Sequence, residues 1–234
     1  MPNLLLFPFE NTILNVTIWI SSVCRIHTHV RSAKIIAGLD TEWLPNLGPQ
    51  EDHPIAVLQL CVGHDCLVFQ ILRSDFIPKS LQVFLADPRH TFCGVGIKDD
   101  VDKLYDHHGL RVGRIADLND LARMSKKMTD GQDRNYRYMG LKKMALALLG
   151  KKMEKPLNVT LSKWDAEELD SAQIQYAAID AAVSFELGFM LCVRVFHPNG
   201  IVRLPPPLPP PPPPPPLYNG IVRLPPPPPP LYSN

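Results

Sequence analysis

The sequence predicts a single α/β domain in which a mixed β-sheet is flanked by helices. Three observations carry this prediction. Apolar, β-branched runs at 33–42, 55–62 and 66–71 follow one another in the first third of the chain, as strands do. A fourth such run at 91–95 lies between two segments with helical spacing. Beyond it, helical patterns dominate up to about residue 196, and this succession is typical of a mixed sheet covered by helices.

The first three strands are predicted from composition and turn chemistry. The run from Ala33 to Glu42 becomes acidic at its C-terminal end and is typical of a buried strand. Ile55–Val62 and Cys66–Ile71 are separated by Gly63-His64-Asp65, which favours a tight turn. We therefore expect a hairpin after the first strand.

A helix, a strand and a second helix are expected next. Pro78 suits a helix start, and the Asp87-Pro88 pair blocks continuation of that helix. Thr91–Val95 is predicted as the fourth strand and Asp99–His107 as the helix that follows it.

The last part of the domain is predicted to be helical. Helices are expected at 117–127 and 140–149, the second closed by Gly150, a residue favoured just beyond a helix end. From Ser171 to Val195 the apolar spacing indicates one long amphipathic helix.

The two ends of the chain differ from this domain, which we assign to residues 33–196. Residues 1–32 form an N-terminal extension in which 16–26 is either a helix or a strand packed on the sheet. Its apolar patches lack a basic start, are interrupted by Glu10 and are far short of a membrane span, so we expect neither a secretory signal nor a membrane partner.

The C-terminal tail, residues 197–234, holds 18 of the 26 prolines and repeats the stretch NGIVRLPPP after 20 residues. A proline run offers no amide donors and a fixed φ, so we expect a disordered, extended polyproline II tail. Such a tail can dock on a proline-recognition domain; an unselected low-complexity extension is the alternative.

The distribution of charge and the number of cysteines limit the classes of function that the chain can have. The 234 residues carry a net charge of +1, but residues 120–155 hold ten basic side chains against four acidic ones. This stretch is either a solvated helix face or a track for a polyphosphate backbone.

No phosphate-binding loop motif is present, which argues against ATP-driven chemistry. Five cysteines without metal-ligand spacing suggest reduced thiols in an intracellular protein.

Acidic residues at three separate places are the candidate functional residues. Asp40 and Glu42 lie two apart in a predicted strand and therefore share a face. Tyr176 and Asp180 lie four apart in the long helix and also share a face. Asp99, Asp100 and Asp102 follow the fourth strand. If these acids converge, a divalent cation would offset their mutual repulsion.

These residues fall in three ordered motifs, GLDTEW at 38–43, GVGIKDD at 94–100 and YAAIDA at 176–181. The motifs resemble those of the DEDD exonucleases of the tyrosine subclass, and in particular the Werner syndrome exonuclease-like family, which is related to the RNase D nucleases. The resemblance covers about residues 33–195. It implies a ribonuclease H-like fold and a 3′–5′ exonuclease that releases nucleoside 5′-monophosphates.

The resemblance also implies the role of each residue. Asp40, Glu42, Asp100 and Asp180 would hold two divalent cations, and Tyr176 would orient the attacking water. Ligands that are all oxygens suit Mg²⁺ or Mn²⁺.

Two positions near these motifs leave choices. The position that holds His in the histidine subclass is Gln175 here, which favours the tyrosine subclass. Asp99 competes with Asp100 for the second motif, and the spacing from Gly94 favours Asp100.

The expected substrate is a nucleic acid with a 3′ end, single-stranded or recessed; the sequence leaves DNA and RNA open. Residues that could contact it are an aromatic at the first motif and four basic side chains between the second and third motifs: Trp43, Arg134, Arg137, Lys142 and Lys143. The family resemblance implies residence in the nucleus, the cytoplasm or both. The alternative is a catalytically weak, nuclease-derived binding or scaffold protein whose tail recruits partners.

Overall fold

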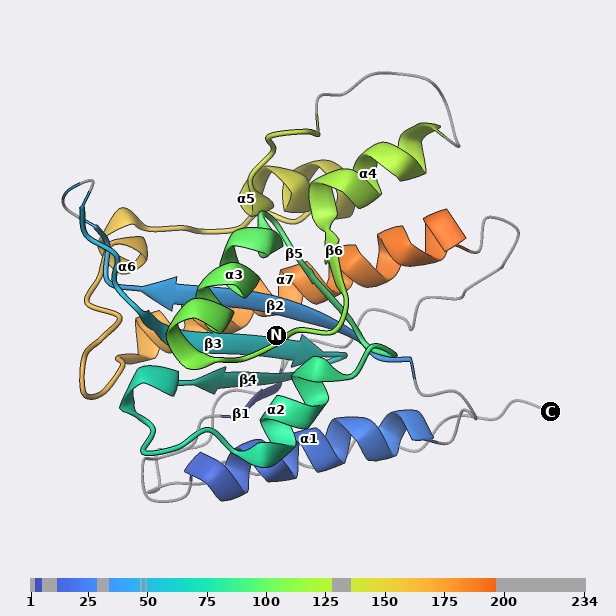
Figure 1. Cartoon of the computed structure of the whole chain (residues 1–234). Coiled ribbons are helices and arrows are strands. Elements are labelled where there is room, and N and C mark those ends of the chain that lie inside the picture. Colours follow the sequence, from blue (N-terminus) through green and yellow to red (C-terminus); the bar gives the residue numbers. More distant parts are fainter. Residues whose placement is uncertain are drawn as a thin grey trace.

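A six-stranded mixed β-sheet forms the centre of the protein in a computed structural model, in the strand order β1-β4-β3-β2-β5-β6 (Figure 1). The structure describes residues 3–5, 12–28, 34–46, 48, 50–127 and 136–196, so the predicted tail lies outside the described residues. The strands are β1 (Asn3–Leu5), β2 (Ile36–Trp43), β3 (Ile55–Val62), β4 (Asp65–Phe69), β5 (Thr91–Gly94) and β6 (Ile115–Asp117).

Strand directions explain why the sheet is mixed. β2, β3 and β4 form an antiparallel meander, whereas β5 and β6 run parallel to β2 on its other side. β1 pairs parallel with β4 at the far edge. The predicted hairpin between β3 and β4 is confirmed, and Gly63 in its turn adopts the positive φ of 63° that glycine tolerates.

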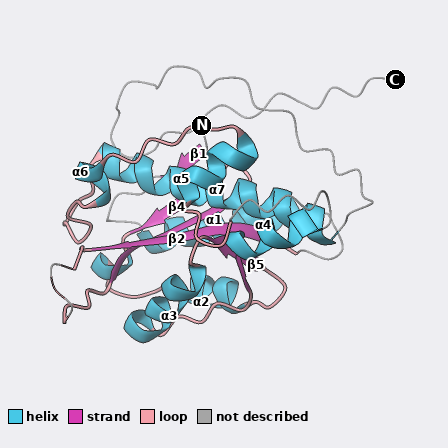
Figure 2. Ribbon diagram, turned by 90° about the horizontal axis from the view of Figure 1, so that it is seen from above, coloured by secondary structure: helices cyan, strands magenta, loops and turns pink. Residues whose placement is uncertain are grey.

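Helices cover both faces of the sheet (Figure 2). Apolar residues of the first three helices pack with the core on one face, and the last helix packs across the other. The helices are α1 (Thr12–Thr28), α2 (Lys79–Ala86), α3 (Ile97–His108), α4 (Leu118–Lys127), α5 (Leu141–Met144), α6 (Leu157–Thr160) and α7 (Ser171–Phe196), with short turns η2 (Ile71–Arg73) and η3 (Ala145–Leu149).

The contact between α7 and β2 is unusually close. A Cβ atom added to Gly38 of β2 would lie 2.0 Å from the Ala181 carbonyl oxygen and 2.5 Å from the Phe185 amide nitrogen. Only glycine therefore permits this backbone approach. The approach places α7, which carries the third predicted motif, directly on the strand that carries the first.

The predicted strands and helices are largely confirmed. β3 has the predicted bounds, α7 extends one residue beyond its predicted end, and Gly150 adopts the positive φ of 68° expected just after a helix. In the N-terminal extension the helix alternative is the correct one, because α1 packs Val16 and Trp19 into the core. These residues match the side of the helix that faces the sheet.

Some predicted boundaries are wrong. β4 ends at Phe69 because residues 71–73 turn into η2, and α3 begins at Ile97, two residues earlier than predicted. Three short elements were not predicted, β1, β6 and α6, since three or four residues are too few for a periodic pattern. The predicted mixed sheet flanked by helices is confirmed.

The long helix α7 is also apolar enough to span a membrane. Among the described residues, Ser171–Val193 has the length and a mean hydropathy of 1.6, but 67% of this window is buried within the domain. Its place against the sheet accounts for its composition.

The expectation of five free thiols is wrong for one pair. Cys61 of β3 and Cys66 of β4 are direct cross-strand neighbours with a Cα–Cα distance of 4.1 Å, and they form a disulfide. The spacing of the two cysteines does not reveal this pair; the register of the β3–β4 hairpin does, because it places Cys61 directly opposite Cys66. Cys24, Cys93 and Cys192 are free.

Candidate metal centre

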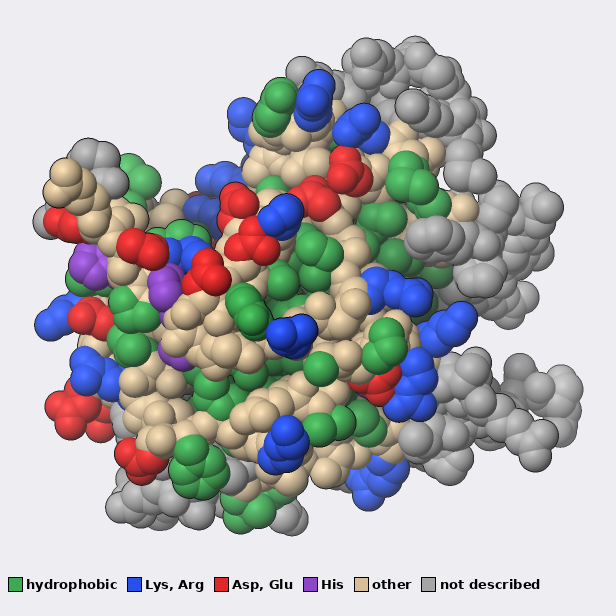
Figure 3. All heavy atoms as spheres, in the orientation of Figure 1, with side chains coloured by type: hydrophobic (Ala, Val, Ile, Leu, Met, Phe, Trp, Pro, Cys, Tyr) green, Lys and Arg blue, Asp and Glu red, His purple; other side chains and the backbone are tan. Residues whose placement is uncertain are grey.

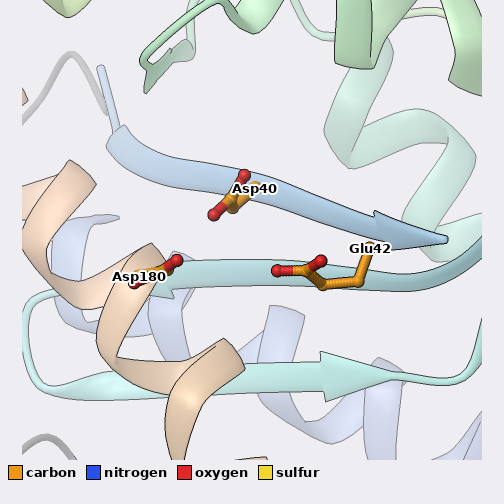
Figure 4. A group of neighbouring side chains, drawn as sticks. All are labelled: Asp40, Glu42 and Asp180. Carbon is orange, nitrogen blue, oxygen red and sulfur yellow. The ribbon is translucent and has the colours of Figure 1, made fainter. Parts of the chain in front are cut away.

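Three carboxylates converge between β2 and α7 (Figure 4). Asp40 and Glu42 project from the same face of β2 because strand side chains alternate, and α7 presents Asp180 to that face. One carboxylate oxygen from each of the three lies within 4.8 Å of the others. Asp180 is 2% exposed, whereas Asp40 and Glu42 are half-buried. Three hard oxygen ligands at this spacing fit a divalent cation such as Mg²⁺ or Mn²⁺.

The pKa values of these three acids are raised, because the carboxylates are buried and lie close to one another. Burial, followed by repulsion from Asp180, Asp100 and Glu42, raises the pKa of Asp40 well above its usual value. Burial and Asp180 raise the pKa of Glu42 to about 8. Burial also raises the pKa of Asp180, although the positive charge of its ion-pair partner Lys155 acts to lower it. The cluster therefore retains protons near neutral pH unless a cation offsets the repulsion.

The second-motif acid, Asp100, is not one of the three grouped carboxylates. Asp100 is 7% exposed, whereas Asp99 is exposed to solvent, so Asp100 is the acid directed into the protein. The Thr41 hydroxyl donates a 2.5 Å hydrogen bond to Asp100 Oδ1. Burial nevertheless raises the pKa of Asp100 to about 6. The structure thus groups three of the four predicted ligands and holds the fourth against Thr41 of the same strand.

Tyr176 lies one helical turn before Asp180, as predicted. Its ring is 7% exposed and packs against Trp164 at 5.8 Å between centroids. Its hydroxyl accepts a 3.4 Å hydrogen bond from the hydroxyl of Thr160. Burial raises the pKa of Tyr176, so the phenol stays protonated and can donate.

Lys155 is a site residue that the sequence analysis counted only as part of a basic stretch. Its ammonium forms an ion pair with Asp180 and lies 5.1 Å from the centre of the Tyr176 ring. Burial alone would lower the pKa of Lys155, but Asp180, Tyr176 and Asp40 together raise it above its usual value. No spacing rule marks this lysine in the sequence.

Gln59 is a second residue that was missed. It lies directly across from Asp40 in the β2–β3 pairing and is fully buried. Neither its amide nitrogen nor its oxygen has a hydrogen-bond partner among the described residues. An unsatisfied buried amide beside the acids is the kind of group that a bound ion's water can satisfy. The sequence did carry a signal, a single polar residue in the apolar strand IAVLQLCV.

The predicted nucleic-acid contacts are spread over both sides of the sheet. Trp43 follows Glu42 but packs toward α3, where the Lys103 ammonium lies 5.1 Å from the centre of its ring. Arg137 lies 5.6 Å from the ring of Tyr138, which is 82% exposed. Arg134 lies outside the described residues.

The α5 helix lies next to the acids. Its Leu141 lines a cavity of about 180 Å³ together with Asp40 and Lys155, and the exposed Lys142 and Lys143 follow directly. On the surface, basic side chains lie near α4 and α5, while acidic ones gather over α3 (Figure 3).

A mixed sheet whose strand β2 carries two acids close to a third acid on α7 is the arrangement that the resemblance to the ribonuclease H-like exonucleases implies. The comparisons with known proteins are specific. Residues 23–191 match the family model for the 3′–5′ exonuclease domain. The chain therefore belongs to the 3′–5′ exonuclease domain family, as the motifs suggested.

Curated relatives agree with this membership. The chain is 35% identical over 152 residues to a 3′–5′ exonuclease of Arabidopsis thaliana, covering 64% of this chain and 50% of the relative. It is 31% identical over 147 residues to the mouse bifunctional 3′–5′ exonuclease/ATP-dependent helicase WRN, covering 62% of this chain and 10% of the relative. The chain thus spans half or less of the length of these two relatives.

Solved structures support the fold. Escherichia coli RNase D, an exoribonuclease, superposes with a TM-score of 0.58 at 20% identity, covering 75% of this chain and 43% of that one. Brucella melitensis NrnC with bound Mg²⁺ gives a TM-score of 0.55 at 24% identity, covering 73% of this chain and 78% of that one.

Proposed function

We propose that this chain is a metal-dependent 3′–5′ exonuclease that hydrolyses the 3′-terminal phosphodiester of a single-stranded or recessed nucleic acid and releases nucleoside 5′-monophosphates. Membership of the exonuclease domain family supports the reaction class. The observation that carries the proposal is the convergence of Asp40, Glu42 and Asp180, whose ligand oxygens lie within 4.8 Å of one another.

The residues fit a divalent cation. All three ligands are carboxylates, which suit Mg²⁺ or Mn²⁺, and the amide of Gln59 adjoins Asp40 without a partner among the described residues. Asp100 would complete a site for a second ion. Two ions held by these four carboxylates would provide activation of the attacking water and charge stabilisation at the leaving 3′ oxygen.

Protein groups supply the rest of the chemistry. The Tyr176 hydroxyl, on a ring that packs against Trp164, hydrogen-bonds to the attacking water and orients it toward the phosphate. Lys142 and Lys143 on α5 attract the phosphate backbone without reading the bases.

Choice between DNA and RNA is not encoded in phosphate and metal contacts. Docking of the proline-rich tail on a recognition domain is proposed from the sequence alone, since the tail lies outside the described residues. Residence in the nucleus or the cytoplasm is proposed from family membership.

The direct test is digestion of oligonucleotides labelled on the 3′-terminal nucleotide in the presence of Mg²⁺ or Mn²⁺. DNA, RNA and hybrid duplexes with recessed or flush ends are assayed beside single strands. The wild-type chain is expected to release labelled monophosphate, and the Asp40→Asn/Glu42→Gln double variant to lose at least about 10³-fold in rate. Equal rates for the two proteins would leave a binding or scaffold role as the better explanation.

A further inference from the structure

Lys155 makes the most buried ion pair that a lysine forms in the described part of the chain. Its side chain is 25% exposed and its partner Asp180 is 2% exposed. The carboxylates that pair with Lys98, Lys103 and Lys151 are at least 42% exposed. Surface pairs of that kind contribute little to stability, whereas a buried ammonium is tolerated only where charge compensates it.

The Lys155 ammonium lies among the acids, where a bound metal cation would lie. It contacts Asp180, lies over the face of the Tyr176 ring at 5.1 Å, and lines the cavity that Asp40 also lines. A divalent ion held by Asp40, Glu42 and Asp180 would require the same carboxylate oxygens and would repel a neighbouring ammonium. Lys155 and the ion therefore compete for Asp180.

We propose that Lys155 is an internal counter-ion of this site, which a divalent cation displaces from Asp180 and which then pairs with the phosphate of the 3′-terminal nucleotide. The inference rests on the proposed exonuclease function for the identity of the phosphate. Lys155 is suited to this exchange because its loop, between η3 and α6, holds the stem at the edge of the cavity while a flexible four-carbon chain carries the charge.

The competition makes two opposite predictions for Lys155→Met. Calorimetric titration of the chelator-treated protein with Mn²⁺ should give about tenfold tighter binding, because a competing positive charge is gone. Fluorescence anisotropy of a labelled single strand with Ca²⁺ in place of the catalytic ion should give about tenfold weaker binding, because a phosphate ligand is gone. General damage to the fold would weaken both.

Two further variants complete the design. Lys151→Met is the matched control, because Lys151 pairs with Glu186, which lies on α7 like Asp180 but is exposed to solvent. The Mn²⁺ affinity of this variant should stay within twofold of wild type. Lys155→Arg keeps the charge and should bring both affinities back toward wild type. If Lys155→Met lowers the melting temperature so far that it cannot be titrated, Lys155→Gln, which is polar and uncharged, replaces it.

Unchanged or weaker Mn²⁺ binding by folded Lys155→Met or Lys155→Gln overturns the competition. Tighter Mn²⁺ binding with unchanged oligonucleotide binding overturns the exchange onto phosphate. Failure of the proposed function is a separate result: the wild-type chain would then release no monophosphate, while the Mn²⁺ titration would still report whether Lys155 competes.

Discussion

The close approach of α7 to β2 predicts that Gly38→Ala damages the metal centre through the backbone. The new methyl carbon would lie 2.0 Å from the Ala181 carbonyl oxygen, and contacts below 3.0 Å essentially never occur. α7 must therefore move by at least about 1 Å. Because the obstructing atoms are backbone atoms, the cost lies near the upper end of overpacking, about 3 kcal/mol. A domain of this size then melts roughly 6–12 °C lower.

The same displacement moves Asp180 away from Asp40 and Glu42. Mg²⁺ demands near-ideal geometry, and a misplacement of about 1 Å can cost roughly 10²-fold in rate. The assays are thermal unfolding, Mn²⁺ calorimetry and monophosphate release. Gly140→Ala is the matched control, because its Cβ would meet nothing within 4 Å at a φ of −65°. Wild-type melting temperature and Mn²⁺ affinity in Gly38→Ala would refute the argument that this contact sets the site.

Three other perturbations follow from the site. Thr41→Val removes the hydrogen bond to Asp100, so we expect a loss of about 1.5–3 kcal/mol in urea unfolding at pH 7 and a further rise in the pKa of Asp100; an unchanged urea midpoint contradicts this. The Glu42 pKa of about 8 in the folded state lies above its value in the unfolded chain, so the unfolded chain loses this proton at lower pH. The free energy of unfolding, measured with a chelator present, should therefore fall from pH 7 to 8.5. Mg²⁺ or Glu42→Gln should flatten that slope, and a rise in stability over this range would count against the raised pKa. Tyr176→Phe keeps the ring against Trp164 but loses the hydroxyl, so monophosphate release should fall about 10²-fold with Mn²⁺ affinity within a few-fold of wild type; an equal loss of Mn²⁺ binding would mean that the hydroxyl shapes the metal site instead.

The parts of the site that could be predicted from sequence follow from local periodicity. Asp40 and Glu42 share a strand face because they are two apart, and Tyr176 and Asp180 share a helix face because they are four apart. That the strand and the helix meet was predicted only through the family resemblance. In the structure the close contact between β2 and α7 depends on the absence of a side chain at Gly38. A single glycine does not change the apolar periodicity of the strand, so the sequence pattern does not predict this contact.

The parts that could not be predicted depend on tertiary contacts. Lys155 lies in a loop and reaches Asp180 across 25 positions, and nothing in its neighbourhood distinguishes it from Lys151 or Lys152. The hydrogen bond from Thr41 to Asp100 joins residues 59 apart. The contact of Trp43 with nucleic acid stays a prediction; the sequence gives no sign that the Lys103 ammonium of α3 lies 5.1 Å from the centre of its ring.

The most direct test of the metal centre is an anomalous difference map from a crystal of the chain grown with Mn²⁺. We expect a peak within coordination distance of the carboxylates of Asp40, Glu42 and Asp180, with the Lys155 ammonium moved off Asp180. A peak elsewhere, or none at a Mn²⁺ concentration that supports monophosphate release, would contradict the assignment of these three acids as the ligands.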